Sequence, residues 1–493
     1  MAADALARQL GSEERTEELD SGVLWAPVSS KLLTNRERRL EASTFLTDGF
    51  GLRQGLEALD STVEMAELAK VWQPSRLKGF PVDDGKGLPF LSAGQVFESQ
   101  HRVRKWLAEA MIPAVETRYL DVRSLLLSCS GEVGRVTAVY DEHLDKVITH
   151  DLLRIDAHDP ADYGWLYAYM KTPTFFAIAR SAQYGHMIKH LEPEHVQQMP
   201  VAMPSLDVRR DIGQDAKNAL EMRQHARRLQ GQADNLYAGL VNPQGLVPTA
   251  SPYTTVSSSE LLTGRRRMEG QFHRADVRQV EDMVQAAGLS VQPLDDLVES
   301  ISLGSRFKRY LGPNGTPYRS ASELFDVNPP VTKRIYSALL PDPDRYLLQP
   351  GWIIMARSGQ TYGLLGRTMV LTENHEGVFG SDDLIRIVPD ETKARTGYLQ
   401  TVLNHVDYGR PRVVRYASGT SVPHLDPPDI RDVLVPRFSQ AQEDEIADLS
   451  DEATALSAEA DRLETAAVRA AEMAIALLTN RHGNVTTMGA VDD

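Results

Sequence analysis

The sequence predicts a mixed α+β protein of the α/β class, with two homologous globular domains joined by two long heptad helices that pair as an antiparallel coiled coil. Two observations predict this fold. The chain of 493 residues contains an internal duplication, and a heptad pattern follows each copy. A repeat of roughly 230 residues is too long for a solenoid, because each copy is large enough to bury a core of its own.

The duplication appears as matched segments that recur in the same order, at offsets that drift only from 228 to 234 residues. The period therefore holds over most of the chain. The matched pairs are Ser75-Arg76-Leu77-Lys78 with Ser305-Arg306-Phe307-Lys308, Gly87-Leu88-Pro89-Phe90 with Gly315-Thr316-Pro317-Tyr318, Ser130-Gly131 with Ser358-Gly359, Asp151–Ile155 with Asp383–Ile387, and Gly185–Pro193 with Gly419–Pro427.

Within each copy, the pattern indicates short strands alternating with helices. Apolar segments rich in β-branched residues, such as 346–355 and 368–372, are bounded by Gly and Pro and are typical of strands. The apolar spacing of 164–180 and 395–406 predicts helices between the strands.

The heptad pattern runs from Ile212 to Leu240 and recurs in the same register from Ile446 to Ala474. Such spacing predicts a coiled-coil seam, about 43 Å long for the first helix at about 1.5 Å per residue. Alanine recurs at one seam position, which allows two helices to approach closely. The residues expected to pair the helices are Ile212, Met222, Leu229, Leu236, Ile446, Leu449, Leu456 and Leu463.

The two helices differ in charge. Residues 205–242 hold six bases and five acids, whereas residues 439–480 hold two bases and ten acids. Unlike flanks favour pairing of the two helices with each other inside one chain. The alternative is that each helix packs on the surface of its own domain.

Composition excludes several classes of protein. Apolar residues make up 42% and charged residues 25% of the chain, as in ordinary globular proteins. No apolar run approaches the ~20 residues that span a bilayer, and the opening Met1-Ala2-Ala3-Asp4 is unlike a signal peptide. The single cysteine, Cys129, excludes an intrachain disulfide or a cysteine zinc site and indicates a cytoplasmic protein.

The formal charge of −15 taken alone argues against a nucleic-acid partner. Its distribution changes that conclusion. Residues 1–20 carry six acids and two bases, and residues 439–493 carry twelve acids and three bases. The chain between these ends is nearly neutral and contains basic clusters, so DNA binding stays open.

Together these features resemble the specificity (S) subunit of type I restriction-modification systems. The resemblance covers residues 25–480. It is carried by Arg39-Leu40-Glu41-Ala42 and Arg267-Met268-Glu269-Gly270 at the start of each copy, by the Ser-Gly turns, and by the closing Gly-x-x-Ile/Val-x-His-Leu-Glu/Asp-Pro segments at Gly185 and Gly419.

The resemblance implies a non-catalytic, DNA-reading subunit active in phage defence. Each globular domain would be a target recognition domain for one half of a split DNA sequence. The helices would form the spacer and dock two modification subunits that methylate adenine, and whether a restriction subunit joins stays open. The chain would bind no cofactor or metal itself; S-adenosylmethionine, and ATP with Mg²⁺ where a restriction subunit is present, would act through partners.

On this interpretation the chain divides into seven parts. They are a flexible acidic tail (1–24), target recognition domain 1 (25–204), the first spacer helix (205–242), a Pro/Ser/Thr-rich linker (243–265), target recognition domain 2 (266–438), the second spacer helix (439–480) and a tail (481–493).

Phosphate contacts need Lys and Arg, and base contacts need polar side chains on loops. Arg76 with Lys78 and Arg306 with Lys308 occupy matched positions, which suits a shared phosphate-contacting role; Arg102 and Lys333 lie in segments that do not align, which suits sequence-specific reading. For each cluster the alternative is a solvated surface. The candidate DNA-contacting residues are Arg76, Lys78, Arg102, Arg104, Lys105, Arg306, Lys308, Arg309, Arg319, Lys333, Arg334, Ser130 and Ser358.

Three motifs suggest other chemistry, and each is incomplete. Asn328-Pro329-Pro330-Val331 lacks the aromatic residue with which adenine methyltransferases stack a flipped base. Asp383 with Glu391-x-Lys393 loosely resembles a metal-dependent nuclease site, but the first copy lacks the Glu-x-Lys. The acids and histidines of 186–195 would suit zinc, but only His190 and Glu192 have counterparts in the second copy.

A second class of function stays open, which is a protein-interaction scaffold without sequence-specific DNA reading. A DNA reader loses affinity steeply with salt because it releases counterions, and a scaffold does not.

Overall fold

The computed structural model describes residues 17, 18, 24, 25, 28, 41–185, 189–262, 267–340 and 342–488. The chain forms two compact units, unit 1 (Met1–Glu221 with Arg462–Asp493) and unit 2 (Met222–Asp461). Each unit therefore holds one copy of the duplicated domain and a stretch of each long helix. Most of the predicted acidic tail, together with Arg39 and Leu40, lies outside the described residues; within the tail, β1 (Glu17–Glu18) pairs antiparallel with β2 (Leu24–Trp25).

Unit 1 is built around an antiparallel sheet of four strands in the order β4-β11-β8-β9. A second sheet has the order β10-β6-β7-β5, and β12 pairs with β3. The strands are β3 (Thr62–Glu64), β4 (Ala69–Trp72), β5 (Pro81–Val82), β6 (Leu88–Leu91), β7 (Lys105–Leu107), β8 (Ser124–Ser128), β9 (Val136–Ala138), β10 (Val147–Ile148), β11 (Leu152–Ala157) and β12 (Pro200–Ala202).

Unit 2 repeats these arrangements. Its main sheet has the order β14-β20-β17-β18, its second sheet the order β16-β15-β19, and β13 pairs with β21. The strands are β13 (Ser290–Pro293), β14 (Val298–Leu303), β15 (Leu311–Arg319), β16 (Lys333–Ile335), β17 (Ile353–Ala356), β18 (Thr368–Val370), β19 (Phe379–Gly380), β20 (Leu384–Pro389) and β21 (Leu434–Arg437). The predicted duplication is confirmed at the level of strand order.

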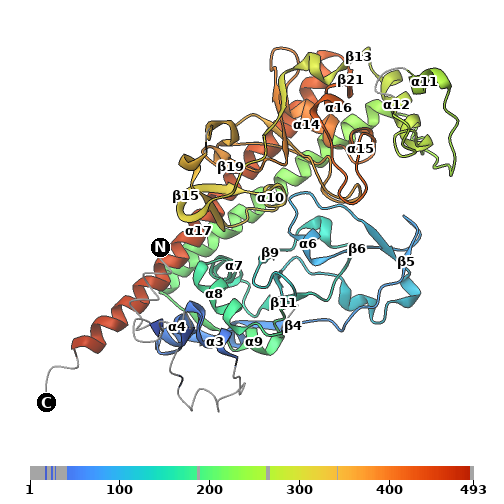
Figure 1. Cartoon of the computed structure of the whole chain (residues 1–493). Coiled ribbons are helices and arrows are strands. Elements are labelled where there is room, and N and C mark those ends of the chain that lie inside the picture. The colour runs from blue at the N-terminus through green and yellow to red at the C-terminus, as the bar shows by residue number, and fades with distance from the viewer. Residues whose placement is uncertain are drawn as a thin grey trace. The chain divides into compact units, whose positions relative to one another are not determined.

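Each unit also contains short helices (Figure 1). In unit 1 they are α3 (Ala42–Phe45), α4 (Asp48–Glu57), α5 (Met65–Leu68), α6 (Ala93–Val96), α7 (Tyr163–Met170), α8 (Pro173–Ala182) and α9 (Pro193–Gln197), and in unit 2 α11 (Ser258–Leu262), α12 (Ala275–Ala287), α13 (Ala321–Leu324), α14 (Thr396–Asn404), α15 (Arg410–Val414) and α16 (Pro427–Arg431). The 3-10 turns are η2 (Glu109–Met111), η3 (Val115–Arg118) and η4 (Asp141–His143) in unit 1, and η5 (Leu294–Leu297), η6 (Ser337–Leu339), η7 (Asp344–Tyr346) and η8 (Glu373–His375) in unit 2.

Two predicted elements are shorter than expected. The single helix expected over 164–180 is two helices, because Pro173 stands at the start of α8 and the Thr172 hydroxyl accepts from the Phe175 amide to cap it. The strand expected over 346–355 is confined to β17, and its first residue, Tyr346, is the last residue of η7. The linker predicted over 243–265 contains α11.

A glycine at a matched position of the two copies, Gly87 and Gly315, is required by the same close main-chain contact in each domain. A Cβ on Gly87 would lie 2.3 Å from the carbonyl oxygen of Leu107, and one on Gly315 would lie 2.4 Å from that of Ile335. No real side chain fits at either distance. The same close approach, entering β6 beside β7 and within β15 beside β16, therefore requires glycine in both copies.

The closing segments pair with the Ser-Gly turns. Ser130 forms a β-bridge with His190, and Ser358 forms the equivalent bridge with His424. The Gly131 amide donates to the Lys189 carbonyl at 3.1 Å, which further ties the turn to this segment. Two motifs far apart in the sequence are thus one structural junction in each domain.

The long helices are α10 (Leu206–Val241), close to its predicted bounds, and α17 (Gln440–Met488), which begins where expected but continues past residue 480 into the predicted tail. Within unit 2 they pair antiparallel, because Arg223 contacts Asp461 at 2.6 Å while Gln230, further along α10, accepts from Ser450 at 3.1 Å. Within unit 1, Ile212 of α10 shares a core with α17 residues around Ala471. The helices lie side by side in each unit (Figure 1).

The alanines of the predicted seam are buried, as close helix packing requires; they are Ala219, Ala226, Ala233, Ala453, Ala460, Ala467 and Ala474. Of the predicted pairing residues, Ile212, Leu229 and Ile446 are buried, whereas Met222, Leu449, Leu456 and Leu463 are half-buried. Leu236 is wrong as a seam residue, because its side chain is 37% exposed while Tyr237 is fully buried.

The buried position shifts from Leu236 to Tyr237 because each helix packs on its own domain as well as on the other helix. A straight helix with 3.6 residues per turn drifts from a strict heptad, and Tyr237 turns into the core of the second domain. Each helix also packs on its own domain. A Cβ on Gly164 of α7 would lie 2.0 Å from the Gly213 carbonyl oxygen of α10, and one on Gly397 of α14 would lie 2.7 Å from that of Ala447 in α17. Helix pairing and packing on the domain therefore both occur.

The C-terminal half of α17 packs against the helices of unit 1. The Tyr167 hydroxyl donates to Glu464 at 2.7 Å, and the Thr174 hydroxyl donates to Glu472 at 2.7 Å. Burial is the main cause that raises the pKa of the Glu472 carboxyl. Among the helices of the described residues, none is long and apolar enough to cross a membrane.

Candidate nucleic-acid interface

The matched segments 75–80 and 305–310, here called the two cationic segments, join the main sheet of each domain to its second sheet. Neither has regular secondary structure: the first follows β4 and leads into β5, and the second follows β14 and leads into β15. Loops between two sheets lie at the surface and commonly carry binding residues. What each segment can bind depends on how its main chain is held and on which side chains it presents.

A buried side chain holds the start of each cationic segment. The Arg118 guanidinium donates to the carbonyl oxygen of Ser75 at 2.6 Å and to its hydroxyl at 3.1 Å. The Tyr346 hydroxyl donates to the carbonyl oxygen of Ser305 at 3.0 Å. Different side chains thus make the same main-chain contact in the two domains.

A main-chain hydrogen bond holds the end of each cationic segment. The Ala108 amide donates to the Phe80 carbonyl at 3.0 Å, and the Tyr336 amide donates to the Tyr310 carbonyl at 2.9 Å. Ala108 follows β7 and Tyr336 follows β16, so the contacts are equivalent. Each segment is fixed at both ends.

Between these anchors, Arg76 and Lys78 in the first segment and Arg306 and Lys308 in the second are exposed. Their side chains make no hydrogen bond or ion pair with any residue that the structure describes. The Lys308 ammonium lies over the Tyr310 ring, 5.1 Å from its centroid. Fixed main chain with uncommitted cations is an arrangement suited to binding phosphate groups.

Each domain also buries an arginine at matched positions of β11 and β20. The Nη1 of Arg154 donates to the Leu152 carbonyl, and that of Arg386 to the Leu384 carbonyl, both at 3.2 Å. Burial lowers the pKa of each guanidinium to about 10, and in the first domain the charge of Arg118 lowers that of Arg154 further. These groups remain cations at neutral pH, so they add positive potential beneath the surface of each domain.

The strands beside the segments bring a correction. Lys105 and Lys333 were expected in segments that do not align, but β7 and β16 are equivalent: Lys105 stands opposite Phe90 and Lys333 opposite Tyr318, the matched aromatic residues. Sequence comparison missed this because the residues around the two lysines differ. Lys105 is exposed, whereas Lys333 lies 3.3 Å from Glu323.

The other predicted contact residues are largely engaged within their own domains. Arg104 pairs with Glu98 and Arg309 with Asp382, each at 2.6 Å, and Arg319 donates to the carbonyls of Pro329 and Pro330. Arg334 donates to the Gly315 carbonyl at 3.1 Å, and Arg102 is half-buried with its carbonyl bonded to Gln95. Ser130 lies in its β-bridge, and the Ser358 hydroxyl donates to Asp383 at 2.7 Å. Arg76, Lys78, Arg306 and Lys308 are thus freer than these side chains, including Arg309 of the second segment.

The incomplete motifs are dispersed among structural contacts. Asn328 donates to the Asp461 carbonyl at 3.3 Å. Asp383 accepts from Ser358, while Glu391 accepts from the Thr396 amide at 3.1 Å. Of the predicted zinc group, His186 lies outside the described residues; the others lie around the junction of the closing segment, where the His195 Nδ1 accepts from the Glu192 amide at 3.1 Å.

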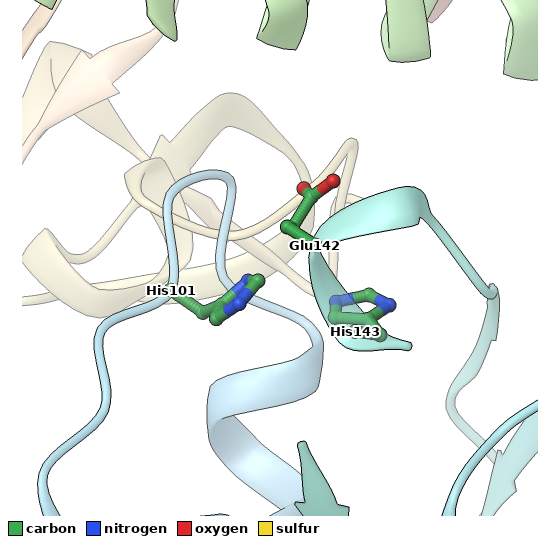
Figure 2. A group of neighbouring side chains, drawn as sticks. All are labelled: His101, Glu142 and His143. Carbon is green, nitrogen blue, oxygen red and sulfur yellow. The ribbon is translucent and has the colours of Figure 1, made fainter. Parts of the chain in front are cut away.

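The structure does gather one set of metal-ligand residues that the sequence did not single out. Ligand atoms of His101, Glu142 and His143 all lie within 4.8 Å of one another, with His101 on a loop and the other two on η4 (Figure 2). The His143 Nδ1 accepts from the Tyr140 amide at 3.1 Å, which leaves its ring proton on Nε2. Coordination through Nε2 would move that proton to Nδ1 and break the bond.

The second domain repeats only the capping role of His143. The His375 Nδ1 accepts from the Thr372 amide at 3.1 Å, in the same position relative to η8. Burial lowers the pKa of both His143 and His375 to about 4. The duplicated chemistry is that of a neutral capping histidine, which weighs against a metal ligand.

No protein-family model and no curated protein matches the chain. Among solved structures, the chain is similar to the type I restriction-modification S subunit from M. genitalium, at 10% identity and a TM-score of 0.35, over 85% of this chain and 96% of that chain. It is also similar to a chain from a study of complex assembly and conformational transition of the type I R-M system, at 13% identity and a TM-score of 0.26, over 85% and 97% of the chains. A third similar structure is the HsdS subunit from Thermoanaerobacter tengcongensis, at 14% identity and a TM-score of 0.25, over 83% and 95%.

Proposed function

We propose that the chain is the specificity subunit of a type I restriction-modification complex. Each globular domain reads one half of a bipartite DNA site, and α10 with α17 docks two modification subunits that methylate adenine. The chain catalyses no step itself. S-adenosylmethionine, and ATP with Mg²⁺ where a restriction subunit joins, act on the partners.

The observation that carries this proposal is the pair of equivalent cationic segments. Arg76 with Lys78, and Arg306 with Lys308, are exposed cations on main chain that is anchored at both ends. A protein that neutralises phosphates in this way gains affinity from released counterions. Two such surfaces on two copies of one fold suit the recognition of two half-sites.

The loops explain why the half-sites should differ. The strand order and the path of the cationic segments are shared, whereas the residues on β7 and β16 differ apart from Lys105 and Lys333. Base reading depends on such side chains at groove edges. We therefore expect a bipartite site with two unlike halves.

The test is to map methylated adenines in the source genome with and without the gene for this chain. Loss of one split motif, with two short blocks around a fixed unspecified gap, is the expected result. If no motif disappears although the partner methyltransferase is expressed and active, the chain acts as an interaction scaffold and the proposal fails.

A further inference from the structure

Each cationic segment ends in an exposed aromatic residue. Phe80 is 49% exposed and Tyr310 is 36% exposed, and the next residue along the chain, Pro81 or Leu311, is exposed as well. Burial of such side chains is favourable, so large apolar groups left at the surface commonly mark contact sites. Here the exposed group stands at the same position in both domains.

In these two aromatic residues the main chain is held by a hydrogen bond, whereas the side chain is exposed. The carbonyl of Phe80 is held by the Ala108 amide and that of Tyr310 by the Tyr336 amide. The rings themselves are exposed, and in the second segment the Lys308 ammonium lies over the Tyr310 ring. An exposed ring on a fixed main chain, next to cations that can bind phosphates, is suited to insertion between two base pairs as a wedge.

We infer that Phe80 and Tyr310 are equivalent wedges that insert between neighbouring base pairs of the DNA held by their segments. Aromatic and aliphatic side chains inserted in this way unstack one base step and kink the duplex. Pro81 and Leu311, which are also wedge-forming residue types, extend the apolar surface. This inference rests on the proposed function and adds to it a local distortion in each half-site.

Insertion of the ring is favourable only if the segment contributes both its cations and its aromatic residue. Opening a base step costs free energy. Two interactions offset this cost: contacts of nearby cations with the displaced phosphates, and stacking of the ring on a base. Arg76 and Lys78 stand four and two residues before Phe80, and Arg306 and Lys308 stand at the same distances before Tyr310. Both segments therefore carry an arginine, a lysine and an aromatic residue at matched positions, and the second carries Arg309 in addition.

The experiment uses the full chain assembled with its methyltransferase subunits and a duplex that contains the mapped bipartite site. The adenine analogue 2-aminopurine, which brightens when it loses a stacking neighbour, is placed at successive positions of each half-site. The methylated adenine is left out of the scan, because the methyltransferase extrudes that base itself. We expect one bright step in each half-site.

Two variants serve as controls for each other. Phe80→Ala should abolish the bright step in the first half-site only, and Tyr310→Ala in the second only, each with about tenfold weaker binding, the scale of one base–aromatic stack. Phe80→Leu should restore part of the signal, because leucine is also a wedge. Tyr253→Ala, at a residue 80% exposed in the linker, should change neither step.

The outcomes separate the two levels of the proposal. If the complex prefers no split sequence, the proposed function itself fails. If it binds the site but no step brightens, or if both alanine variants keep the bright steps, the wedge assignment is wrong. If Phe80→Ala instead releases the methyltransferase subunit in a pull-down, the ring belongs to a protein contact and the inference is overturned.

Discussion

The two domains hold equivalent segments by different chemistry. In the first domain the Arg118 guanidinium makes two hydrogen bonds to Ser75, and in the second the Tyr346 hydroxyl makes one to the carbonyl of Ser305. The cations that each segment presents are nevertheless the same two residue types. What the duplicated copies share is the path of the main chain and its exposed charges, whereas the buried group that fixes the path has changed.

The largest expected effect tests the contact of each domain with its own helix. In Gly164→Ala the new Cβ would lie 2.0 Å from a carbonyl oxygen of α10, so we expect a loss of about 3 kcal/mol or more in the stability of unit 1. Gly397→Ala should cost less, because the nearest atom belongs to the Asp451 carboxylate, which can move, and the nearest main-chain atom, the Ala447 carbonyl oxygen, is 2.7 Å away. Urea unfolding, with hydrogen exchange to assign the unit, measures both.

The matched control is Gly51→Ala, at a helical glycine of α4 with nothing within 4 Å of its added Cβ. That change should stabilise the chain slightly through helix propensity. Equal destabilisation by Gly51→Ala and Gly164→Ala would contradict the close helix contact.

The second prediction concerns pH. The pKa of His143 and of His375 is about 4 in the folded chain against 6.5 for the ordinary side chain. Between these values the unfolded state binds more protons, so stability rises with pH and is lost as pH falls from about 6.5 toward about 4. Thermal unfolding at a series of pH values should show this slope for both units.

His143→Gln should flatten the slope for unit 1 alone. The glutamine oxygen can accept from the Tyr140 amide, as Gln95 does from the Ser92 amide at 3.1 Å. A variant that keeps the full slope in unit 1 would show that other groups set the pH dependence.

The third prediction compares the anchors. Arg118→Met removes both hydrogen bonds that the buried guanidinium makes to Ser75, whereas Tyr346→Phe removes one neutral bond worth about 1 kcal/mol. We expect weaker binding of the first half-site in Arg118→Met and a smaller loss at the second half-site in Tyr346→Phe. Affinity for duplexes with one half-site scrambled measures each loss, and an equal loss at both half-sites would refute the local role of the anchors.

The smallest expected effect is on the slope of log K for DNA binding against log salt concentration. Arg76→Ala with Lys78→Ala should lower the salt dependence of DNA binding by about 2 in log K against log salt, about one for each phosphate that is no longer neutralised. The variant should weaken binding to all sequences alike. Arg123→Ala, at an exposed arginine 3.1 Å from Asp121, is the control and should leave the slope unchanged.

Sequence patterns predicted the duplication, the domain architecture and both long helices, because these depend on long matched runs and on periodic apolar spacing. They failed at Leu236, since packing of Tyr237 into the second domain overrides the heptad. The anchors could not be predicted, because Arg118 and Tyr346 are unlike residues that meet the same carbonyl only in the fold. The equivalence of β7 and β16 was hidden for the same reason.

Phe80 and Tyr310, by contrast, were within reach of the sequence. They stand two residues after the matched Ser-Arg-Leu-Lys and Ser-Arg-Phe-Lys segments, at the same offset of 230 residues. Only their exposure required the structure, since an aromatic residue between two strands is more often part of a core.

The most direct test of the central claim, that each domain reads its own half of a split site, is a chain in which residues 290–437 are replaced by the equivalent residues 62–202. Methylated adenines are then mapped in cells that hold this chain and the partner methyltransferase. We expect a motif built from two copies of the first half-site, with the second half-site gone. An unchanged motif, or none at all although the complex assembles, would contradict the claim.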